Sequence, residues 1–450
     1  MSAVYLLSLT FVSIVALLLL IIVFRIQAFI ALLLVSLGVA LAGGIPLPEI
    51  IDTIQEGMAG TLGYIAIVIG IGTMIGEILQ VSGGARQIAQ TIVKSFGESK
   101  APWALSLIGL IVAIPVFFEV ALILFIPLVY NLTRRTDKSL LHYGIPLVAG
   151  MAVAHAFIPP TPGPVAVSAL IGADLGWVIF FGFIAGIPAV IAGGIYFGKF
   201  IGTRIFTEVP EHMMAKIIDI EQDESKRDPG FGVAVTIIAI PIVLILMNTA
   251  SNVLLPEEHM ASVWMSFIGH PFTALMIAAL LAFYFLGTRL GFSREEIQIV
   301  ATKSMQPVGM IILLTGAGGV FGNVLVTTGV GDVIVDIMDN SNLPVVLFAF
   351  IVATTIRVSQ GSATVAMVTT AGLMAPVIEL GNFSDPLIGA VAISIASGAT
   401  VLSHVNDTGF WLVKEFMGLT EKQTLLSWTI METIIGVTGL LVVLVISWFL

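Results

Sequence analysis

The stretch that decides the fold occurs twice in the chain. Residues 62–84 read LGYIAIVIGIGTMIGEILQVSGG, and residues 308–330 read VGMIILLTGAGGVFGNVLVTTGV. At an offset of 246 residues the two segments share five glycines, namely Gly63/Gly309, Gly70/Gly316, Gly72/Gly318, Gly76/Gly322 and Gly83/Gly329. Flanking identities, Glu49/Glu295 and Ile88/Ile334, extend the same register in both directions. Chance coincidence of glycines does not explain one ungapped register with matched flanks, so we expect two homologous halves.

The composition indicates the solvent in which these halves fold. The 450-residue chain is 58% hydrophobic and 10% charged, whereas a soluble domain contains about 25% charged residues. Several apolar runs reach the roughly 20 residues needed to cross the hydrocarbon of a bilayer. The first of them, residues 4–24, is expected to be a retained transmembrane helix. We therefore predict an all-α, polytopic membrane protein embedded in the lipid bilayer.

Two classes of function are excluded at this point. The chain has no cysteine, which excludes disulfides, thiolate metal sites and thiol nucleophiles. Its net charge of −10 argues against a nucleic-acid partner.

The positions of the basic residues orient the expected spans, because Lys and Arg favour cytoplasmic loops. The expected spans lie near residues 4–24, 26–45, 60–80, 143–170, 176–200, 231–253, 265–287, 304–327, 387–413 and 425–449. The apolar runs at 103–132 and 343–378 each have both flanks on one side in this scheme. They are expected to be re-entrant hairpins, the first open to the cytoplasm and the second to the outside. Both chain termini are then predicted to lie outside.

This arrangement divides the chain into two inverted repeats. The first is expected at 1–205 and the second at 230–450, with a cytoplasmic linker at 206–229. Each repeat holds five spans and one hairpin, and the odd number of crossings inverts the second repeat relative to the first. Inverted repeats with helices interrupted at mid-membrane are typical of secondary transporters. Symmetry and charge therefore predict a transporter.

The first interrupted helix, at 143–170, contains the sequence HAFIPPTPGPVAV. Its four prolines, Pro159, Pro160, Pro162 and Pro164, remove backbone donors and cannot continue a helix. Such backbone is tolerated in a membrane only where it is buried in protein or lines an aqueous cavity. A simple proline kink is the alternative interpretation, although one proline would suffice for that. Pro160, Thr161 and Gly163 are therefore predicted to contact substrate.

The second hairpin carries the sequence RVSQGSAT, residues 357–364. Gly361 permits a sharp turn, and hydroxyl side chains after it can cap a helix whose unpaired N–H groups attract an anion. Arg357 would cost roughly 2.5–3.5 kcal/mol at mid-membrane, and its guanidinium matches a carboxylate. We therefore expect a small anionic substrate. The predicted contacts from this half are Arg357, Ser359, Gln360, Gly361, Ser362, Thr364, Asn406 and Thr408. The alternative is that Arg357 forms a structural ion pair with Asp407 or Glu119.

Several ionisable groups at depth could carry a coupling proton. A carboxyl group in a medium of low dielectric constant takes up a proton more readily than in water. Glu119 stands between Phe118 and Val120 and is the first candidate, followed by Asp407 and His404. His155 precedes the first break much as His404 precedes the second. Glu432 was expected to be shallow, near a helix end, and no cofactor or metal is expected.

Four short segments together resemble the gluconate permease family of the ion transporter superfamily. They are GGARQIAQTIV at 83–93, PPTPGP at 159–164, GSATVAM at 361–367 and FWLVKEF at 410–416. The resemblance implies a bacterial inner-membrane symporter that takes up gluconate or a related sugar acid with protons. It also implies a homodimer in which a transport domain moves like an elevator against a scaffold. The scaffold would hold helices within 1–93 and 231–340. The transport domain would hold the hairpins 103–132 and 343–378 and the broken helices 143–170 and 387–413.

Two other functions compete with this one. A sodium-coupled or exchange carrier of small carboxylates would fit the same fold. A single arginine suits a monocarboxylate, however, and the hairpin tips lack a matched pair of Ser-Asn-Thr sites. An intramembrane metalloenzyme could in principle use His155, His404 and Asp407 as ligands. The chain has neither an HExxH helix nor a serine elbow, so we expect that it is not an enzyme.

Overall fold

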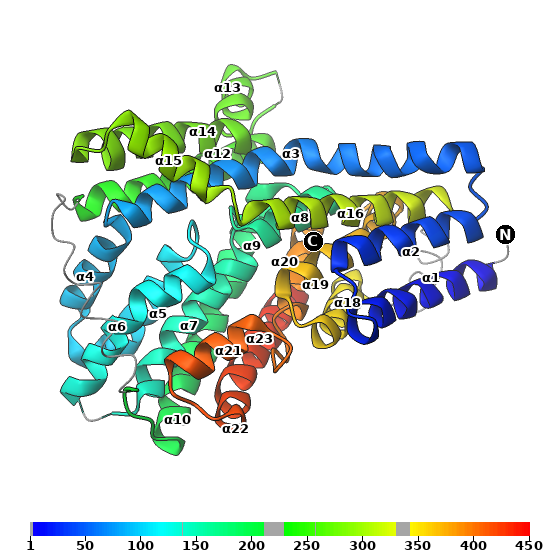
Figure 1. The fold of residues 1–450 in the computed structure, drawn as a ribbon. Coiled ribbons are helices and arrows are strands. Elements are labelled where there is room, and N and C mark those ends of the chain that lie inside the picture. Colours follow the sequence, from blue (N-terminus) through cyan, green and yellow to red (C-terminus); the bar gives the residue numbers. More distant parts are fainter. Residues whose placement is uncertain (1–2, 137, 211–228, 257, 330–342) are drawn as a thin grey trace.

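The computed structural model describes residues 3–136, 138–210, 229–256, 258–329 and 343–450. The predicted linker 206–229 therefore lies mostly outside the described residues, and so does Ile334, one of the residues matched between the halves. Within the described ranges every regular element is a helix (Figure 1). This confirms the all-α class predicted from the composition.

The helices of the first half follow one another with short connections. They are α1 (Ala3–Leu18) with η1 (Leu19–Val23), α2 (Ala28–Ala42), α3 (Leu47–Val81), α4 (Gly84–Phe96), η2 (Glu98–Lys100), α5 (Ala101–Val112), α6 (Phe118–Thr136), α7 (Leu140–Phe157), α8 (Pro162–Ile171), and α9 (Leu175–Ala189), which continues through η3 (Val190–Tyr196) into α10 (Phe197–Arg204).

The second half contains a comparable series. Its helices are α12 (Phe231–Leu254), α13 (Met260–Ile268), α14 (Pro271–Ala282) with η4 (Phe283–Gly287) and η5 (Thr288–Leu290), α15 (Arg294–Ser304), α16 (Val308–Thr327), α18 (Val345–Gln360), α19 (Ala363–Leu380), α20 (Asp385–Gly398), α21 (Thr408–Phe416), and α22 (Glu421–Thr424), which continues through η6 (Leu425–Thr429) into α23 (Ile430–Ser447).

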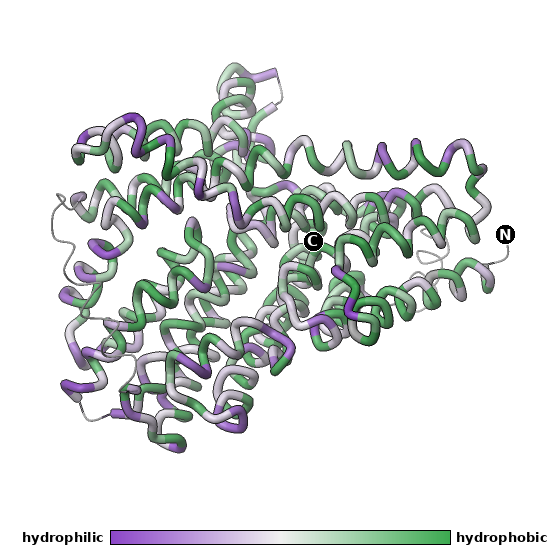
Figure 2. The backbone as a smooth tube through the Cα atoms, viewed as in Figure 1, coloured by the Kyte–Doolittle hydropathy of each residue, from purple (hydrophilic) through white to green (hydrophobic). Residues whose placement is uncertain are grey.

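The described helices have the length and polarity of membrane spans. Nine helical stretches in the described part of the chain are long and apolar enough to cross a membrane. Figure 2 shows hydrophobic residues along most of the helical segments and hydrophilic ones mainly toward their ends. The predicted polytopic class is therefore supported by length and by composition.

The 246-residue register found in the glycine stretch also relates the later elements of the two halves. The α5–α6 pair, with its turn at 113–117, corresponds to α18–α19, with its turn at 361–362. α8 begins at Pro162 and α21 at Thr408, which is the same offset. Both halves therefore contain a helical hairpin followed by an interrupted helix.

The two helices that carry the glycine repeat, α3 and α16, run antiparallel. α3 and α16 share the glycine repeat and pack along one another in the upper layer of Figure 1. The Asn323 side-chain amide donates to the Thr53 carbonyl at 2.8 Å, and a Cβ atom on Gly319 would lie 2.7 Å from the Gly57 carbonyl oxygen. Thr53 contacts Asn323, and Gly57, further along α3, contacts Gly319, which is earlier in α16. The two helices therefore run in opposite directions. This is the relation expected between inverted repeats.

The structure corrects the predicted limits of two spans. α3 begins at Leu47, although its span was predicted near 60–80, because the acidic residues of its first turns suggested a loop. Glu49 lies in the first turn, where the helix dipole favours a negative charge, while Thr53 packs on α16. The span predicted near 304–327 begins at Val308, since Pro307 is the N-cap and separates α15 from α16.

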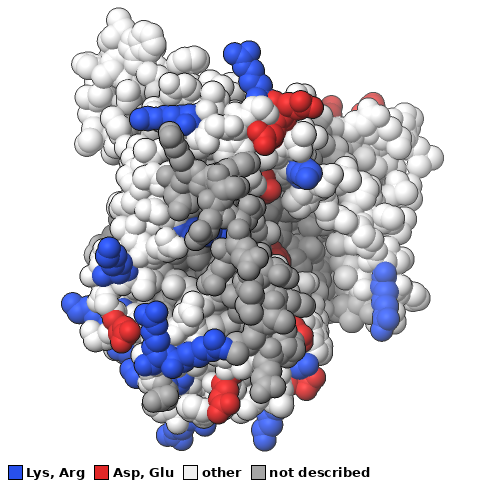
Figure 3. All heavy atoms as spheres, turned by 60° about the vertical axis from the view of Figure 1, so that its left-hand side comes forward, with Lys and Arg blue, Asp and Glu red and all other residues white. Residues whose placement is uncertain are grey.

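Basic side chains gather on one part of the surface. α6 ends with Arg134 and Arg135, and α10 ends with Arg204. Figure 3 shows Lys and Arg side chains grouped over the lower part of the molecule, where these helices end in Figure 1. The assignment of this end to the cytoplasm stays a prediction.

Candidate functional site

The two helical hairpins and the two interrupted helices meet around a cavity of about 160 Å³. Its wall combines parts of both halves with the helix α23 near the end of the chain. The lining residues are Phe118, Glu119, Ala152, His155, Ala156, Arg357, Gly361, Ser362, Ala363, Thr364, Thr400, Asn406, Asp407, Thr408, Gly409, Trp428 and Glu432. Most charged groups predicted at depth are therefore neighbours in space.

Arg357 lies buried in the cavity wall and pairs with Asp407. Its Nη2 atom is 2.6 Å from Oδ2 of Asp407, and the two side chains are 2% and 16% exposed. The Nη1 atom donates to the carbonyl oxygen of Gly361. The Nε atom is buried and has no hydrogen-bond partner in the part of the chain that the structure describes. Arg357 thus forms the ion pair considered as the alternative, and its partner is Asp407 rather than Glu119.

The turn of the second hairpin positions this arginine. α18 ends at Gln360, and its C-cap Gly361 has a φ of 83°, in the left-handed region that side chains disfavour. A Cβ atom at Gly361 would lie 2.2 Å from the carbonyl oxygen of Asn406. Ser362 caps α19 by accepting from the Val365 amide at 3.4 Å. The hairpin tip therefore packs directly on the break before α21.

The second break holds Asp407 in a chain of hydrogen bonds. Asp407 is the N-cap of α21, and its Oδ1 atom accepts from the Gly409 amide at 3.1 Å. Its Oδ2 atom also accepts from the hydroxyl of Ser403. Ser403 in turn accepts from the indole Nε1 of Trp428 at 2.7 Å. One carboxylate therefore caps a helix, balances Arg357 and connects to the helical segment that continues into α23.

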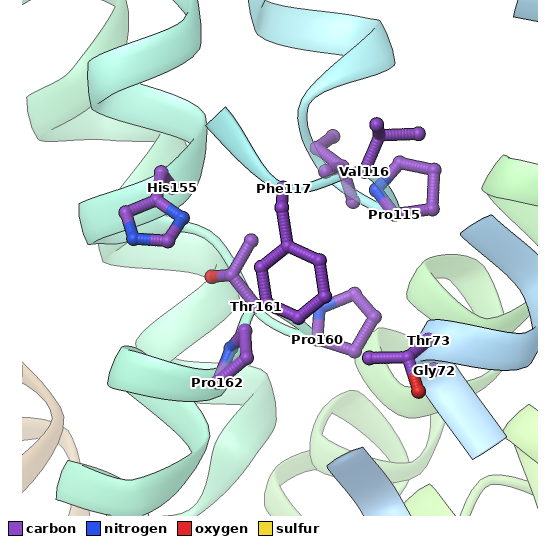
Figure 4. A pocket seen from close by; sticks show the side chains of 10 residues that line it. Gly72, Thr73, Pro115, Val116, Phe117, His155, Pro160, Thr161 and Pro162 are labelled. Carbon is purple, nitrogen blue, oxygen red and sulfur yellow. The ribbon is translucent and has the colours of Figure 1, made fainter. Parts of the chain in front are cut away.

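The first break makes a smaller, less polar pocket beside the cavity. Its volume is about 10 Å³, and Figure 4 shows the Phe117 ring near Pro160 and Thr161. The Thr161 hydroxyl donates to the Ile158 carbonyl at 2.6 Å. His155 lines both this pocket and the larger cavity, and its buried Nδ1 atom has no hydrogen-bond partner.

Most of the predicted site residues reach one of these two spaces. Arg357, Gly361, Ser362, Thr364, Asn406, Thr408, Glu119, Asp407 and His155 line the larger cavity. Pro160 and Thr161 line the smaller pocket. Their roles remain predictions.

Four predicted residues are not among those that line either space. The Ser359 hydroxyl donates to the Thr355 carbonyl of its own helix at 2.8 Å. Gln360 has both amide atoms buried without a hydrogen-bond partner. A Cβ atom on Gly163 would lie 2.5 Å from Cε of Met367, and His404 contacts the Leu402 carbonyl through Nδ1 at 2.8 Å.

The environments predicted for two carboxyl groups were wrong. Glu119 was expected among apolar side chains, but it is exposed and lines the cavity. It stands in the first turn of α6, while Phe118 beside it packs on Trp428 with ring centroids 5.5 Å apart. Glu432 was expected to be shallow, yet it is 3% exposed and lines the cavity. The helical stretch Glu421–Ser447 places it well inside the span.

Sequence reasoning also missed Trp428 and Thr400 in the cavity wall. A signal for Glu432 existed, since it is a lone carboxyl group within a long apolar run. Within the described part of the chain, no group of three His, Cys, Asp or Glu side chains could hold a metal ion.

Comparison with known proteins identifies the family. A model described as GntP family permease matches residues 5–449. The chain belongs to the GntP permease family. The permease is 42% identical over 430 residues to the low-affinity gluconate transporter of Escherichia coli K12, covering 96% of this chain and 95% of that one. It is 39% identical to a gluconate permease of Pseudomonas aeruginosa, with 98% of each chain covered.

Another relative carries a different substrate in its name. The permease is 37% identical to the Gnt-II system L-idonate transporter of Escherichia coli K12, with 96% of each chain covered. These names describe transporters and permeases, which confirms the expected transporter class and the expectation that the chain is not an enzyme.

Two solved structures share the fold of the permease. The Neisseria gonorrhoeae protein MtrF, described with a class of antimetabolite efflux pumps, matches with a TM-score of 0.63 at 13% identity. The match covers 88% of this chain and 83% of MtrF. The Alcanivorax borkumensis YdaH transporter matches with a TM-score of 0.60 at 12% identity, covering 90% and 89%. At these identities the likeness supports the predicted transporter fold alone.

Proposed function

We propose that the permease takes up gluconate or a closely related sugar acid together with protons across the bacterial inner membrane. The observation that carries the proposal is Arg357, a buried guanidinium in the wall of a cavity at the meeting point of two interrupted helices. The family and the names of its relatives support the choice of a sugar acid.

The cavity offers a distinct place for each part of such a substrate. A carboxylate fits beside Arg357, where the amino-terminal turns of α19 and α21 also face the cavity through Ser362 and Thr408. Hydroxyl groups fit the side chains of Thr364 and Asn406. These five residues make the substrate site of this proposal.

Coupling to protons follows from competition for one guanidinium. Asp407 already occupies Nη2 of Arg357, so an incoming carboxylate meets a pair whose charges are balanced. Neutralising a carboxyl group in the cavity by protonation removes the repulsion between that group and the substrate. Of the predicted proton carriers, Asp407, Glu119 and His155 line the cavity, and His404 is the less favoured candidate.

Movement of the loaded site is proposed to follow an elevator mechanism in a homodimer with both termini outside. The hairpins and interrupted helices would move as a transport domain against a scaffold within residues 1–93 and 231–340. Contacts between small residues, such as those of Gly322 in α16 with Gly372 in α19, provide a surface on which helices can slide.

The test is uptake of labelled gluconate into proteoliposomes under an inward pH gradient, with and without sodium. Accumulation driven by protons alone supports the proposal. Uptake that requires sodium would replace it with a sodium-coupled carrier. If L-idonate is accumulated and gluconate is not, the substrate is the related sugar acid, and proton coupling stands.

A further inference from the structure

Glu432 is the most deeply buried carboxyl group of the cavity, and the proposed function gives it no role. Glu432 is 3% exposed, and its Oε1 atom has no hydrogen-bond partner among the described residues. An unpartnered buried polar atom in a native structure requires an explanation. A buried carboxylate without a compensating partner is strongly disfavoured.

Among the described residues that line the cavity, Arg357 is the one guanidinium near Glu432. Its Nη2 atom is bound to Asp407 and its Nη1 atom to the Gly361 carbonyl. Asp407 from the second break and Glu119 from α6 add further carboxyl groups, and α7 adds the imidazole of His155. Apart from Asp407 and Glu432 itself, the described lining residues that follow α20 are uncharged, and they are Thr400, Asn406, Thr408, Gly409 and Trp428.

Counting charges shows when Glu432 can ionise. With every carboxyl group ionised, the cavity wall carries three negative charges against one guanidinium, before any substrate enters. An anionic substrate would add a fourth negative charge at close range. Glu432 is therefore more readily protonated when an anionic substrate is bound. It ionises more readily when the cavity is empty.

We propose that Glu432 binds the coupling proton of this permease, a role that rests on the proposed proton-coupled uptake. The substrate binds while Glu432 is a neutral carboxylic acid. After translocation the acid releases its proton to cavity water, and the resulting carboxylate repels the substrate anion. One proton thus leaves with each substrate.

The hydrogen-bond chain connects this group to the substrate site. Trp428 and Glu432 are four residues apart in one helical segment, so their side chains share a face. The Trp428 indole donates to Ser403, whose hydroxyl donates to Asp407, the partner of Arg357. A shift of the helix on ionisation of Glu432 is therefore transmitted to the ion pair.

The experiment compares exchange with accumulation in proteoliposomes containing the full-length Glu432→Gln variant. Glutamine has the shape and neutral charge of the protonated acid, so exchange of labelled for unlabelled gluconate without a pH gradient should persist. With one proton per substrate, a pH difference of one unit supports roughly tenfold accumulation in the unmodified permease. In Glu432→Gln the accumulation ratio should fall to about one. Exchange by the unmodified permease should also decrease at alkaline pH, and exchange by Glu432→Gln should not.

Matched variants decide between the carboxyl groups. Glu379→Gln removes an exposed carboxyl group near the end of α19 and should accumulate gluconate normally. Accumulation of gluconate by Glu432→Gln would overturn the proposal. It would also be overturned if Glu119→Gln lost accumulation while Glu432→Gln kept it. Loss of exchange in a folded Glu432→Gln protein would also overturn it.

If Glu432→Gln does not fold, Glu432→Asp, which keeps the acid, should accumulate gluconate, and failure of a folded Glu432→Asp protein to do so would overturn the proposal. Failure of the unmodified permease to couple gluconate to protons would instead refute the proposed function.

Discussion

The two halves of the permease share a framework and differ in the chemistry placed on it. Position 161 is a threonine and its equivalent, 407, is an aspartate, yet both are the N-cap of the helix after a break. The turn residue Pro115 corresponds to Gly361, and Ile111 corresponds to Arg357. The charged pair therefore exists in the second half alone. Repetition explains the fold, and departure from repetition explains the site.

The halves also differ in how their hairpins meet the long helices. In the first half a Cβ atom on Gly76 would lie 1.7 Å from the Pro115 carbonyl oxygen, at the hairpin tip. In the second half a Cβ atom on the equivalent Gly322 would lie 3.1 Å from the Gly372 carbonyl oxygen, 11 residues beyond the tip at Gly361. Equivalent hairpins thus occupy different heights. If the hairpins move with a transport domain, as proposed above, this asymmetry is expected when that domain is at one end of its movement.

The first prediction, with the largest expected effect on uptake, concerns the contact between α16 and the second hairpin. The chain has no cysteine, and a Cβ atom on Gly322 would lie 3.5 Å from Cβ of Ala375, within the range of a disulfide. The double variant Gly322→Cys, Ala375→Cys should form a cross-link that fixes α16 to α19. Gluconate uptake should then stop in the cross-linked fraction and return on reduction. Full uptake by cross-linked protein would contradict movement at this contact.

The second prediction tests the charge of Arg357. Arg357→Gln keeps a hydrogen-bonding side chain but removes the guanidinium. Gluconate binding should weaken roughly 10- to 100-fold, since a hydrogen bond to a charged group contributes about 1.5–3 kcal/mol. Isothermal titration of the detergent-purified protein measures this. Ile111→Leu at the equivalent position should bind normally, and unchanged affinity in Arg357→Gln would refute the carboxylate assignment.

The third prediction is an increase in the affinity for gluconate, on removal of the charge of Asp407. Asp407→Asn retains an N-cap acceptor and removes the carboxylate that competes with substrate for Arg357. The empty protein should be less stable, because breaking a buried ion pair leaves one charge uncompensated. Gluconate should bind more tightly and raise the melting temperature more than in the unmodified permease. Weaker binding would show that Asp407 positions Arg357 rather than competing for it.

The smallest effect is expected at the equivalent position in the first half. Thr161→Val preserves shape and removes the hydroxyl that donates to the Ile158 carbonyl. The free energy of unfolding should fall by about 1 kcal/mol. The rate of gluconate uptake should stay within roughly threefold of that of the unmodified permease, which corresponds to a change of less than about 1 kcal/mol in the activation free energy. A loss of uptake as large as that of Arg357→Gln would show that both halves bind substrate.

The sequence predicted the framework better than it predicted the cavity. The glycine register indicated the two halves, the placement of basic residues predicted both hairpins, and the four prolines predicted the first break. These features depend on local residue types, which the sequence shows directly. The early start of α3 was missed, since Glu49 reads as a loop residue until Thr53 is seen against α16. The burial of Glu432 was missed because it depends on how α23 packs among distant segments. Pairing of Arg357 with Asp407 was one of two alternatives that only the packing could separate.

The spacing of the ion pair also has a consequence for biosynthesis. Arg357 and Asp407 are 50 residues apart in the chain, so the arginine leaves the ribosome well before its partner. At 5–20 residues per second this delay is roughly 3–10 s. During that time α18 would enter lipid with an unbalanced charge, and the free-energy cost of inserting that charge is roughly 2.5–3.5 kcal/mol. The second hairpin should therefore complete its insertion only when the following break has been synthesised, and a nascent chain ending before Asp407 should insert it poorly.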